Sequence, residues 1–137
     1  MPMAESQIKV SSIMFTDIVG YSRMVARDES HALKLLDEHN TIIGKSIEEH
    51  SGHIIKFIGD SVFAEFSKSQ DAGNCAIDIQ NKLINRNKIH SKNDRIHIRI
   101  GLHMGELVVK GDDLFGNTVN LGSRIEGVAP SNGILIS

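Results

Sequence analysis

Residues 95–104, RIHIRIGLHM, alternate between polar and apolar side chains, a pattern that few structures other than a β-strand can satisfy. The apolar positions are Ile96, Ile98, Ile100, Leu102 and Met104, and the polar positions are Arg95, His97, Arg99 and His103. Successive side chains of a strand point to opposite faces. The segment therefore predicts a strand with one buried face, in a sheet that is open on its other side. We interpret the two histidines as polar residues of the open face and not as metal ligands.

The rest of the chain alternates between strand and helix patterns. Apolar and β-branched runs predict strands over residues 12–15, 53–58, 62–66 and 133–137. Helical spacing of apolar residues predicts helices over residues 28–52, 71–87 and 117–128. Gly52 is expected to end the first helix, Asp71 to cap the second, and Leu121, Ile125 and Val128 to form the buried side of the third. The order β-α-β-β-α-β predicts an α+β, ferredoxin-like (split βαβ) fold, an antiparallel sheet with helices packed on one face.

The composition excludes several classes of protein. The 137 residues are 40% apolar and carry a net charge of −2, which gives no electrostatic reason for binding nucleic acid or an anionic membrane. The most basic stretch, residues 85–95, is interpreted as a solvated connection, with a weak anion-steering patch as the alternative. The single cysteine, Cys75, falls in a helical apolar pattern and is expected in the core. No secretory signal or membrane-spanning run is recognisable, so a cytoplasmic protein is expected.

A carboxylate, Asp17, closes the first predicted strand, and a second, Asp60, sits in the Gly-Asp-Ser turn between residues 58 and 62. In a split βαβ sheet we expect the first two strands to be neighbours, which would bring the two aspartates together. They would repel each other unless a divalent cation lay between them, and such oxygen ligands suit Mg²⁺. The following turn, IVGYS, offers backbone N–H groups to phosphates. Alternatively, each aspartate is an ordinary polar residue of a strand end or turn.

Three segments, FTDIVGYS, KFIGDSVFAEF and RIGLHMGELVVKGDDLFGNTVNLGSRIEG, closely resemble the class III adenylate and guanylate cyclase catalytic domain. The resemblance runs in order from about residue 11 to residue 137, after an N-terminal extension of residues 1–10. It implies the nucleotide cyclase version of the ferredoxin-like fold. The family domain continues past residue 137 with a further helix and two strands, so the sequence is expected to be truncated at its C-terminal end. Family architectures can also place regulatory segments downstream.

The resemblance implies a two-metal site and a phosphate-binding turn. Two divalent ions, Mg²⁺ or Mn²⁺, would be held by Asp17, Asp60 and the backbone carbonyl of Ile18. Gly20, Tyr21 and Ser22 lie where the family's backbone wraps the β- and γ-phosphates of the substrate.

The resemblance also assigns the residues that would recognise the nucleoside. Lys56 and Asp113 match the pair that reads the purine, Asn120 the residue that orients the ribose, and Arg124 the residue that stabilises charge on the α-phosphate. A carboxylate and an ammonium complement the amine and the ring nitrogen of adenine, whereas guanylate-forming relatives usually carry Glu and Cys there. ATP is therefore the expected substrate. Gly122 departs from the family's usual alanine, which a close approach by a partner chain could explain.

The implied reaction is attack of the ribose 3′-hydroxyl on the α-phosphorus, which yields 3′,5′-cyclic AMP and pyrophosphate. Lys56 and Asp60 are separated by about 13 Å if the chain between them is extended, so one chain is not expected to use both on one nucleotide. The family solves this with a head-to-tail homodimer, and two shared sites are expected here.

Three alternatives are weighed against an adenylate cyclase. A guanylate cyclase is disfavoured by Lys56 and Asp113. A non-catalytic nucleotide-binding or dimerisation module is disfavoured by the full set of site residues, although the absent C-terminal segment keeps it open. A diguanylate cyclase would carry a glycine-glycine-acidic signature where this sequence reads FIGDSV.

Overall fold

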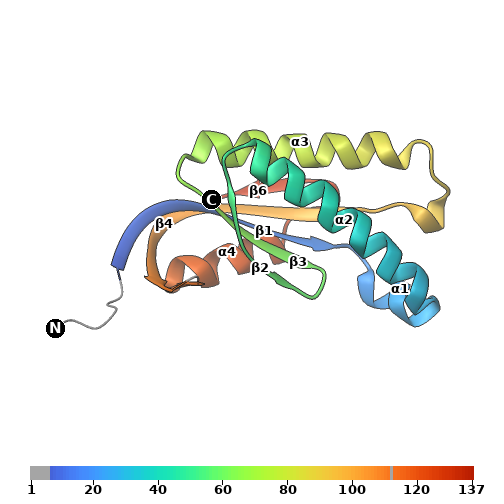
Figure 1. The fold of residues 1–137 in the computed structure, drawn as a ribbon, viewed down its shortest axis with the longest axis horizontal. Coiled ribbons are helices and arrows are strands. Elements are labelled where there is room, and N and C mark those ends of the chain that lie inside the picture. Colours follow the sequence, from blue (N-terminus) through green and yellow to red (C-terminus); the bar gives the residue numbers. More distant parts are fainter. Residues whose placement is uncertain (1–6, 112) are drawn as a thin grey trace.

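The computed structural model describes residues 7–111 and 113–137, which form a curved antiparallel sheet with helices on both sides (Figure 1). The strands are β1 (Gln7–Ile18), β2 (His53–Ile58), β3 (Ser61–Phe66), β4 (Ile98–Lys110), β5 (Asp113–Phe115) and β6 (Ile134–Ile136). The helices are α1 (Tyr21–Arg27), α2 (Glu29–Glu49), α3 (Ser69–Asn87), the 3₁₀ turn η1 (Lys92–Asp94) and α4 (Asn117–Gly127).

The strand order β2-β3-β1-β4-β5 confirms the ferredoxin-like arrangement, with β6 added parallel to β4. The expectation that the first two strands are neighbours is wrong, because β1 pairs with β3 and β4 while β2 lies outside β3. Thr16 of β1 faces Val62 of β3. The turn before β3 therefore lies at the C-terminal end of β1. Asp60 is near Asp17 because β1 pairs with β3, and not because it pairs with β2.

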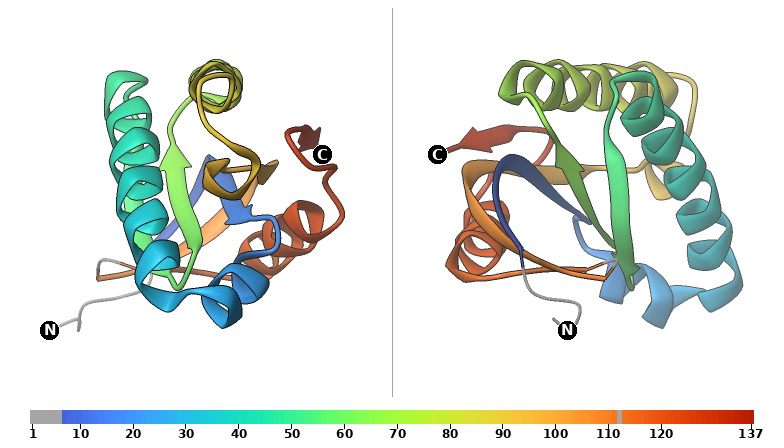
Figure 2. Two further views of the ribbon diagram at one scale, coloured as in Figure 1. Left: turned by 90° about the vertical axis from the view of Figure 1, so that its right-hand side faces the viewer. Right: turned by 60° about the vertical axis from the view of Figure 1, so that its left-hand side comes forward.

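The two faces of the sheet are covered by different helices, which corrects the expectation that all helices pack on one face. The long helices α2 and α3 cover one face, and α4 covers the other (Figures 1 and 2). The larger core contains Met14, Ile43 and Ile79 and lies under α2 and α3, where Cys75 is also buried. A smaller cluster on the opposite face contains Phe15 stacked on Phe63, with ring centroids 4.4 Å apart.

The alternating pattern of residues 95–104 is confirmed for most of its length. Ile96, Ile98, Ile100 and Leu102 are buried, whereas Met104 is 55% exposed. The sheet bends along β1 and β4 (Figure 2), and Met104 lines a cavity beside the start of α3 instead of lying in the core.

Helix α4 packs on β4 through positions that have no room for a side chain. A Cβ on Gly101 would lie 2.4 Å from the backbone nitrogen of Glu126, and one on Gly105 would lie 2.6 Å from Oγ1 of Thr118. The buried side of α4 consequently carries Thr118, Gly122 and Glu126, spaced four residues apart. The prediction of Leu121, Ile125 and Val128 as its buried side is wrong, since Val128 is 74% exposed and the other two are only partly buried.

Gly122 is required by a contact within the chain. A Cβ at this position would lie 2.6 Å from Cδ1 of Ile13 and 3.2 Å from Cδ2 of Phe15, both on β1. The close approach is therefore to the chain's own sheet.

Two of the predicted helix ends differ from the structure. The side chain of Asp28 accepts a hydrogen bond from the backbone of His31 and caps α2, whereas Asp71 lies inside the first turn of α3 and does not cap it. Helix α2 ends at Glu49, and Ser51 rather than Gly52 takes the left-handed backbone conformation, with φ 63°.

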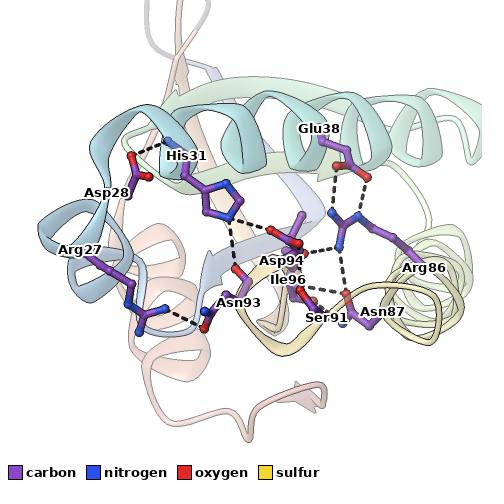
Figure 3. A network of polar contacts seen from close by, with 10 residues as sticks. All are labelled: Arg27, Asp28, His31, Glu38, Arg86, Asn87, Ser91, Asn93, Asp94 and Ile96. Atoms are coloured by element: carbon purple, nitrogen blue, oxygen red, sulfur yellow. Dashed lines mark hydrogen bonds and ion pairs between the residues drawn. The ribbon is translucent and has the colours of Figure 1, made fainter.

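The connection from α3 to β4 is largely exposed, as predicted, but its first two residues after Asn85 are anchored in the protein. The Arg86 side chain is only 8% exposed, pairs with Glu38 of α2, and donates to the backbone carbonyl of Asp94 (Figure 3). Asn87 bonds both the backbone N–H and the carbonyl of Ile96. These contacts fix the start of β4 against α2 and α3.

Among the described residues, no helix combines the length and the apolar character that crossing a bilayer would need.

Candidate active site

Asp17 lies on β1 directly opposite Arg99 of β4. The Arg99 guanidinium donates two hydrogen bonds to its carboxylate, from Nε at 3.0 Å and from Nη2 at 2.6 Å. This parallel, two-bond geometry is the strong form of a charge-assisted hydrogen bond. The alternating pattern of residues 95–104 predicts Arg99 on the open face of the sheet, but nothing in that pattern connects it with Asp17. Its place opposite a strand-end aspartate becomes evident only from the strand register.

Asp60 occupies the tight turn between β2 and β3, where Gly59 adopts a left-handed backbone with φ 59°. Its Oδ2 accepts a hydrogen bond of 2.8 Å from the backbone N–H of Ile18. The structure thus brings together Asp17, Ile18 and Asp60, the three predicted metal-binding residues, at the C-terminal end of β1. That these residues bind metal remains a prediction.

A third carboxyl group, that of Glu126, lies near Asp17 and Arg99. It was not among the site residues predicted from the sequence. It is 7% exposed, and its Oε2 finds no hydrogen-bond partner within the described part of the chain. Burial raises the pKa of Glu126 to about 8, and the neighbouring carboxylate of Asp17 adds to the rise. Arg99 opposes it, with Nε 3.9 Å from Oε2 of Glu126. We name Asp17, Asp60 and Glu126 the acidic cluster.

The acidic cluster has the chemistry of an incomplete cation site. Asp17 and Glu126 share the Arg99 guanidinium, whereas Asp60 accepts only from the backbone of Ile18 among its described contacts. An additional cation would favour the ionised form of all three carboxyl groups, and their hard oxygen atoms suit Mg²⁺ or Mn²⁺. No three His, Cys, Asp or Glu side chains in the described ranges are arranged to hold a metal by themselves. Backbone, water or substrate oxygen atoms would therefore have to supply the remaining ligands, as is common for Mg²⁺.

The predicted phosphate-binding turn directly follows β1. Gly20 takes a left-handed conformation with φ 73°, and α1 starts at Tyr21. Tyr21 is partly buried and Ser22 is exposed. Burial raises the pKa of the Tyr21 hydroxyl, and the negative charge of Asp60 adds to the rise. The turn therefore lies beside the acidic cluster, which is the arrangement that a bridging metal–phosphate unit would require.

Lys56 and Asp113 form an ion pair, with Nζ 2.7 Å from Oδ2. The two residues come from β2 and β5, at opposite ends of the strand order, and they meet because the sheet curls (Figure 2). Both side chains remain partly exposed, at 43% and 33%. The structure thus brings together the two residues predicted to read the purine, although no described contact connects them with the acidic cluster.

Asn120 and Arg124 lie one turn apart on α4, and both are exposed. The buried side of the same helix carries Glu126. The predicted ribose and α-phosphate residues therefore do not point to the acidic cluster of their own chain.

Comparison with known proteins identifies a family. Residues 3–137 match the model of the adenylate and guanylate cyclase catalytic domain. A relative from Rhizobium meliloti (strain 1021), named "Putative adenylate cyclase 3", is 34% identical over 98% of this chain and 24% of its own length. An adenylate cyclase from Streptomyces coelicolor is 27% identical over 91% of this chain and 32% of its own length. This chain therefore spans about a quarter to a third of these relatives.

A solved structure shares the whole architecture. The adenylate/guanylate cyclase/hydrolase from Silicibacter pomeroyi superposes with a TM-score of 0.90 at 30% identity, covering 97% of this chain and 78% of that one. The fold, the order of the motifs and the family match agree with one another. The chain belongs to the adenylate and guanylate cyclase catalytic domain family.

Proposed function

We propose that this protein is an adenylate cyclase that converts ATP to 3′,5′-cyclic AMP and pyrophosphate in a homodimer with shared active sites. The observation that carries the proposal is the convergence of Asp17, Ile18 and Asp60 beside the turn that begins at Gly20. Several relatives named as adenylate cyclases support it.

Asp17, Asp60 and the carbonyl oxygen of Ile18 would hold two divalent ions, Mg²⁺ or Mn²⁺. Bound ions would favour deprotonation of the ribose 3′-hydroxyl and offset the charge on the departing pyrophosphate. Arg99 must release or share the Asp17 carboxylate when ions bind, because both of its oxygens are now bonded to the guanidinium. The backbone at Gly20, Tyr21 and Ser22 would bind the β- and γ-phosphates.

The Lys56–Asp113 pair supports adenine as the base. Asp113 can accept from the adenine amine while Lys56 donates to the ring nitrogen, and the ion pair holds both groups ready at 2.7 Å. Guanine has a carbonyl in place of the adenine amine and an N–H in place of the ring nitrogen. Its carbonyl would therefore face the carboxylate of Asp113, and its N–H would face the ammonium of Lys56. A buried mismatch of this kind costs about 1–3 kcal/mol per unpaired group, which corresponds to about 5- to 150-fold discrimination.

The placement of Asn120 and Arg124 favours a shared site. Both lie on the exposed side of α4, whereas Glu126 of the acidic cluster lies on its buried side. In a head-to-tail dimer, the exposed pair of one chain can meet a nucleotide whose phosphates rest on the other chain. The pair would then orient the ribose and stabilise the charge on the α-phosphate.

The direct test is the formation of cyclic nucleotide from ATP and from GTP, each with Mg²⁺ and with Mn²⁺. The proposal predicts cyclic AMP as the main product and its loss in Asp17→Ala and in Asp60→Ala. Cyclic GMP as the main product would show a guanylate cyclase. Nucleotide binding without either product would show a non-catalytic module.

A further inference from the structure

A strongly basic pocket borders the predicted phosphate-binding turn, and its charged side chains have no role in the proposed reaction. It has a volume of about 220 Å³ and lies between the start of α1, the turn η1 and the residues that lead into β4. The polar residues that line it are Arg23, Arg27, Lys92, Asn93, Arg95 and His97. We call this cavity the basic pocket. No acidic side chain is among its described lining residues.

The four cations of the basic pocket are not neutralised by carboxylates. Arg27 donates to the side-chain amide oxygen of Asn93 at 3.0 Å (Figure 3), and Arg95 donates to the backbone carbonyl of His90 at 3.1 Å. Neither Arg23 nor Lys92 forms an ion pair with a described residue. Uncharged acceptors thus orient Arg27 and Arg95 and leave their positive charge available to a ligand.

Asp94 is adjacent in sequence to Asn93 and Arg95 of the pocket, and its carboxylate is bound by other residues. The Asp94 carboxylate is 2.8 Å from Nε2 of His31 and accepts a hydrogen bond of 2.9 Å from Ser91 (Figure 3). These contacts direct it toward α2. Four positive charges without a counter-charge are unusual in a chain whose net charge is −2, and anion binding would offset their mutual repulsion.

The basic pocket lies just beyond the end of β1 that carries Asp17. Asp17 is opposite Arg99, and two residues further along the chain, directly after β1, the N–H of Val19 donates to the carbonyl of His97 at 2.8 Å. Two residues along a strand correspond to about 7 Å. Val19 and Gly20 line the pocket, and the Arg23 guanidinium lies 3.0 Å from where a Cβ of residue 20 would stand.

We propose that the basic pocket is a second anion site that binds an oligophosphate, with pyrophosphate as its simplest ligand. Arginine side chains bind phosphate through paired hydrogen bonds, and Arg23, Arg27 and Arg95 reach the cavity from two sides. The anion has two sources: pyrophosphate released at the adjoining cluster, or a phosphorylated compound from solution. Only the link to the released product rests on the proposed function, since binding itself needs no catalysis.

The test is calorimetric titration of pyrophosphate into the 137-residue chain with excess chelator, so that no divalent ion contributes. The double variant Arg27→Gln/Arg95→Gln is compared with Lys34→Gln/Lys45→Gln, which removes the same charge from exposed positions of α2. The proposal predicts at least about tenfold weaker binding in the first variant and an unchanged affinity in the second. Equal affinities in all three proteins, equal weakening in both variants, or no binding to the unmodified chain would overturn it. Matching unfolding midpoints would establish that the variants are folded.

A second measurement separates the two sources of the anion. In a cyclase assay, release of product through the pocket predicts that Arg27→Gln/Arg95→Gln raises the inhibition constant of added pyrophosphate. A solution ligand predicts an unchanged inhibition constant together with loss of the calorimetric signal. The calorimetric result stands even if the chain forms no cyclic nucleotide, so the anion site and the proposed function can fail separately.

Discussion

The contact between Gly101 and α4 gives a prediction that can be worked from the structure. A Cβ at residue 101 would lie 2.4 Å from the backbone nitrogen and 2.6 Å from Cα of Glu126. Ordinary carbon contacts begin near 3.4 Å, so Gly101→Ala would push α4 away from β4 by up to about 1 Å. The obstacle is helix backbone, which cannot rotate aside as a side chain can.

We expect Gly101→Ala to lower the free energy of unfolding by about 1–3 kcal/mol, the usual cost of overpacking. Gly73→Ala is the matched control: Gly73 lies inside α3, and a Cβ there would meet nothing within 4 Å. Because alanine is the better helix former, the control should raise the free energy of unfolding by about 0.5–1 kcal/mol. The same glycine-to-alanine change is therefore expected to lower the free energy of unfolding at position 101 and to raise it at position 73.

Urea denaturation followed by circular dichroism measures both variants. Activity should fall in Gly101→Ala, since the displaced helix carries Glu126 on one side and Asn120 and Arg124 on the other. Gly73→Ala should leave activity unchanged. A Gly101→Ala protein whose free energy of unfolding lies within about 0.5 kcal/mol of the unmodified protein would refute the reasoning from close packing.

Three further predictions concern the site and its supports. Asp17→Ala and Arg124→Ala chains, each inactive alone, should regain cyclic AMP formation when mixed, because a mixed dimer retains one intact site; absence of activity in the mixture would contradict shared sites. In divalent-free buffer the free energy of unfolding should fall as pH rises from about 4.5 to about 8, because folding raises the pKa of Glu126 over that range and ionisation is then penalised only in the folded state. Glu126→Gln should flatten this dependence in urea titrations at several pH values, and an unchanged slope would show that another group is responsible. Arg86→Ala should cost about 2–4 kcal/mol because it removes a buried guanidinium that joins two helices, whereas the exposed Lys82→Ala should cost less than about 1 kcal/mol; similar thermal midpoints would refute the distinction.

The strand pattern and the order of elements could be predicted from sequence because they depend on local periodicity. The alternation over residues 95–104, the hairpin around Asp60 and the buried stripe containing Cys75 are properties of neighbouring residues. Strand neighbours are not local properties. The predicted pairing of the first two strands is wrong. Asp60 still lies beside Asp17, because the turn that holds Asp60 leads directly into β3, and β3 pairs with β1.

The orientation of α4 could not be predicted by looking for apolar residues. Its buried side is defined by the absence of side chains at Gly101, Gly105 and Gly122, which lets Thr118 and Glu126 approach the sheet. The useful signal was the pair of glycines in the strand pattern, which marks a close approach by another backbone.

The pairing of Lys56 with Asp113 depends on the curvature of the whole sheet. The residues are 57 positions apart and belong to strands at opposite ends of the strand order. The resemblance to the cyclase family predicted that they work together, whereas no periodicity in the sequence could have shown it.

Two divalent ions seated between positions 17 and 60 are the central claim, and anomalous X-ray diffraction tests it most directly. Crystals would be grown with Mn²⁺ and an ATP analogue that lacks the 3′-hydroxyl. The account predicts two anomalous peaks bonded to the carboxylates of Asp17 and Asp60, one of them also to the carbonyl oxygen of Ile18, with Arg99 turned away from Asp17. Manganese bound elsewhere, or an Arg99–Asp17 pair that persists beside bound nucleotide without metal, would contradict it.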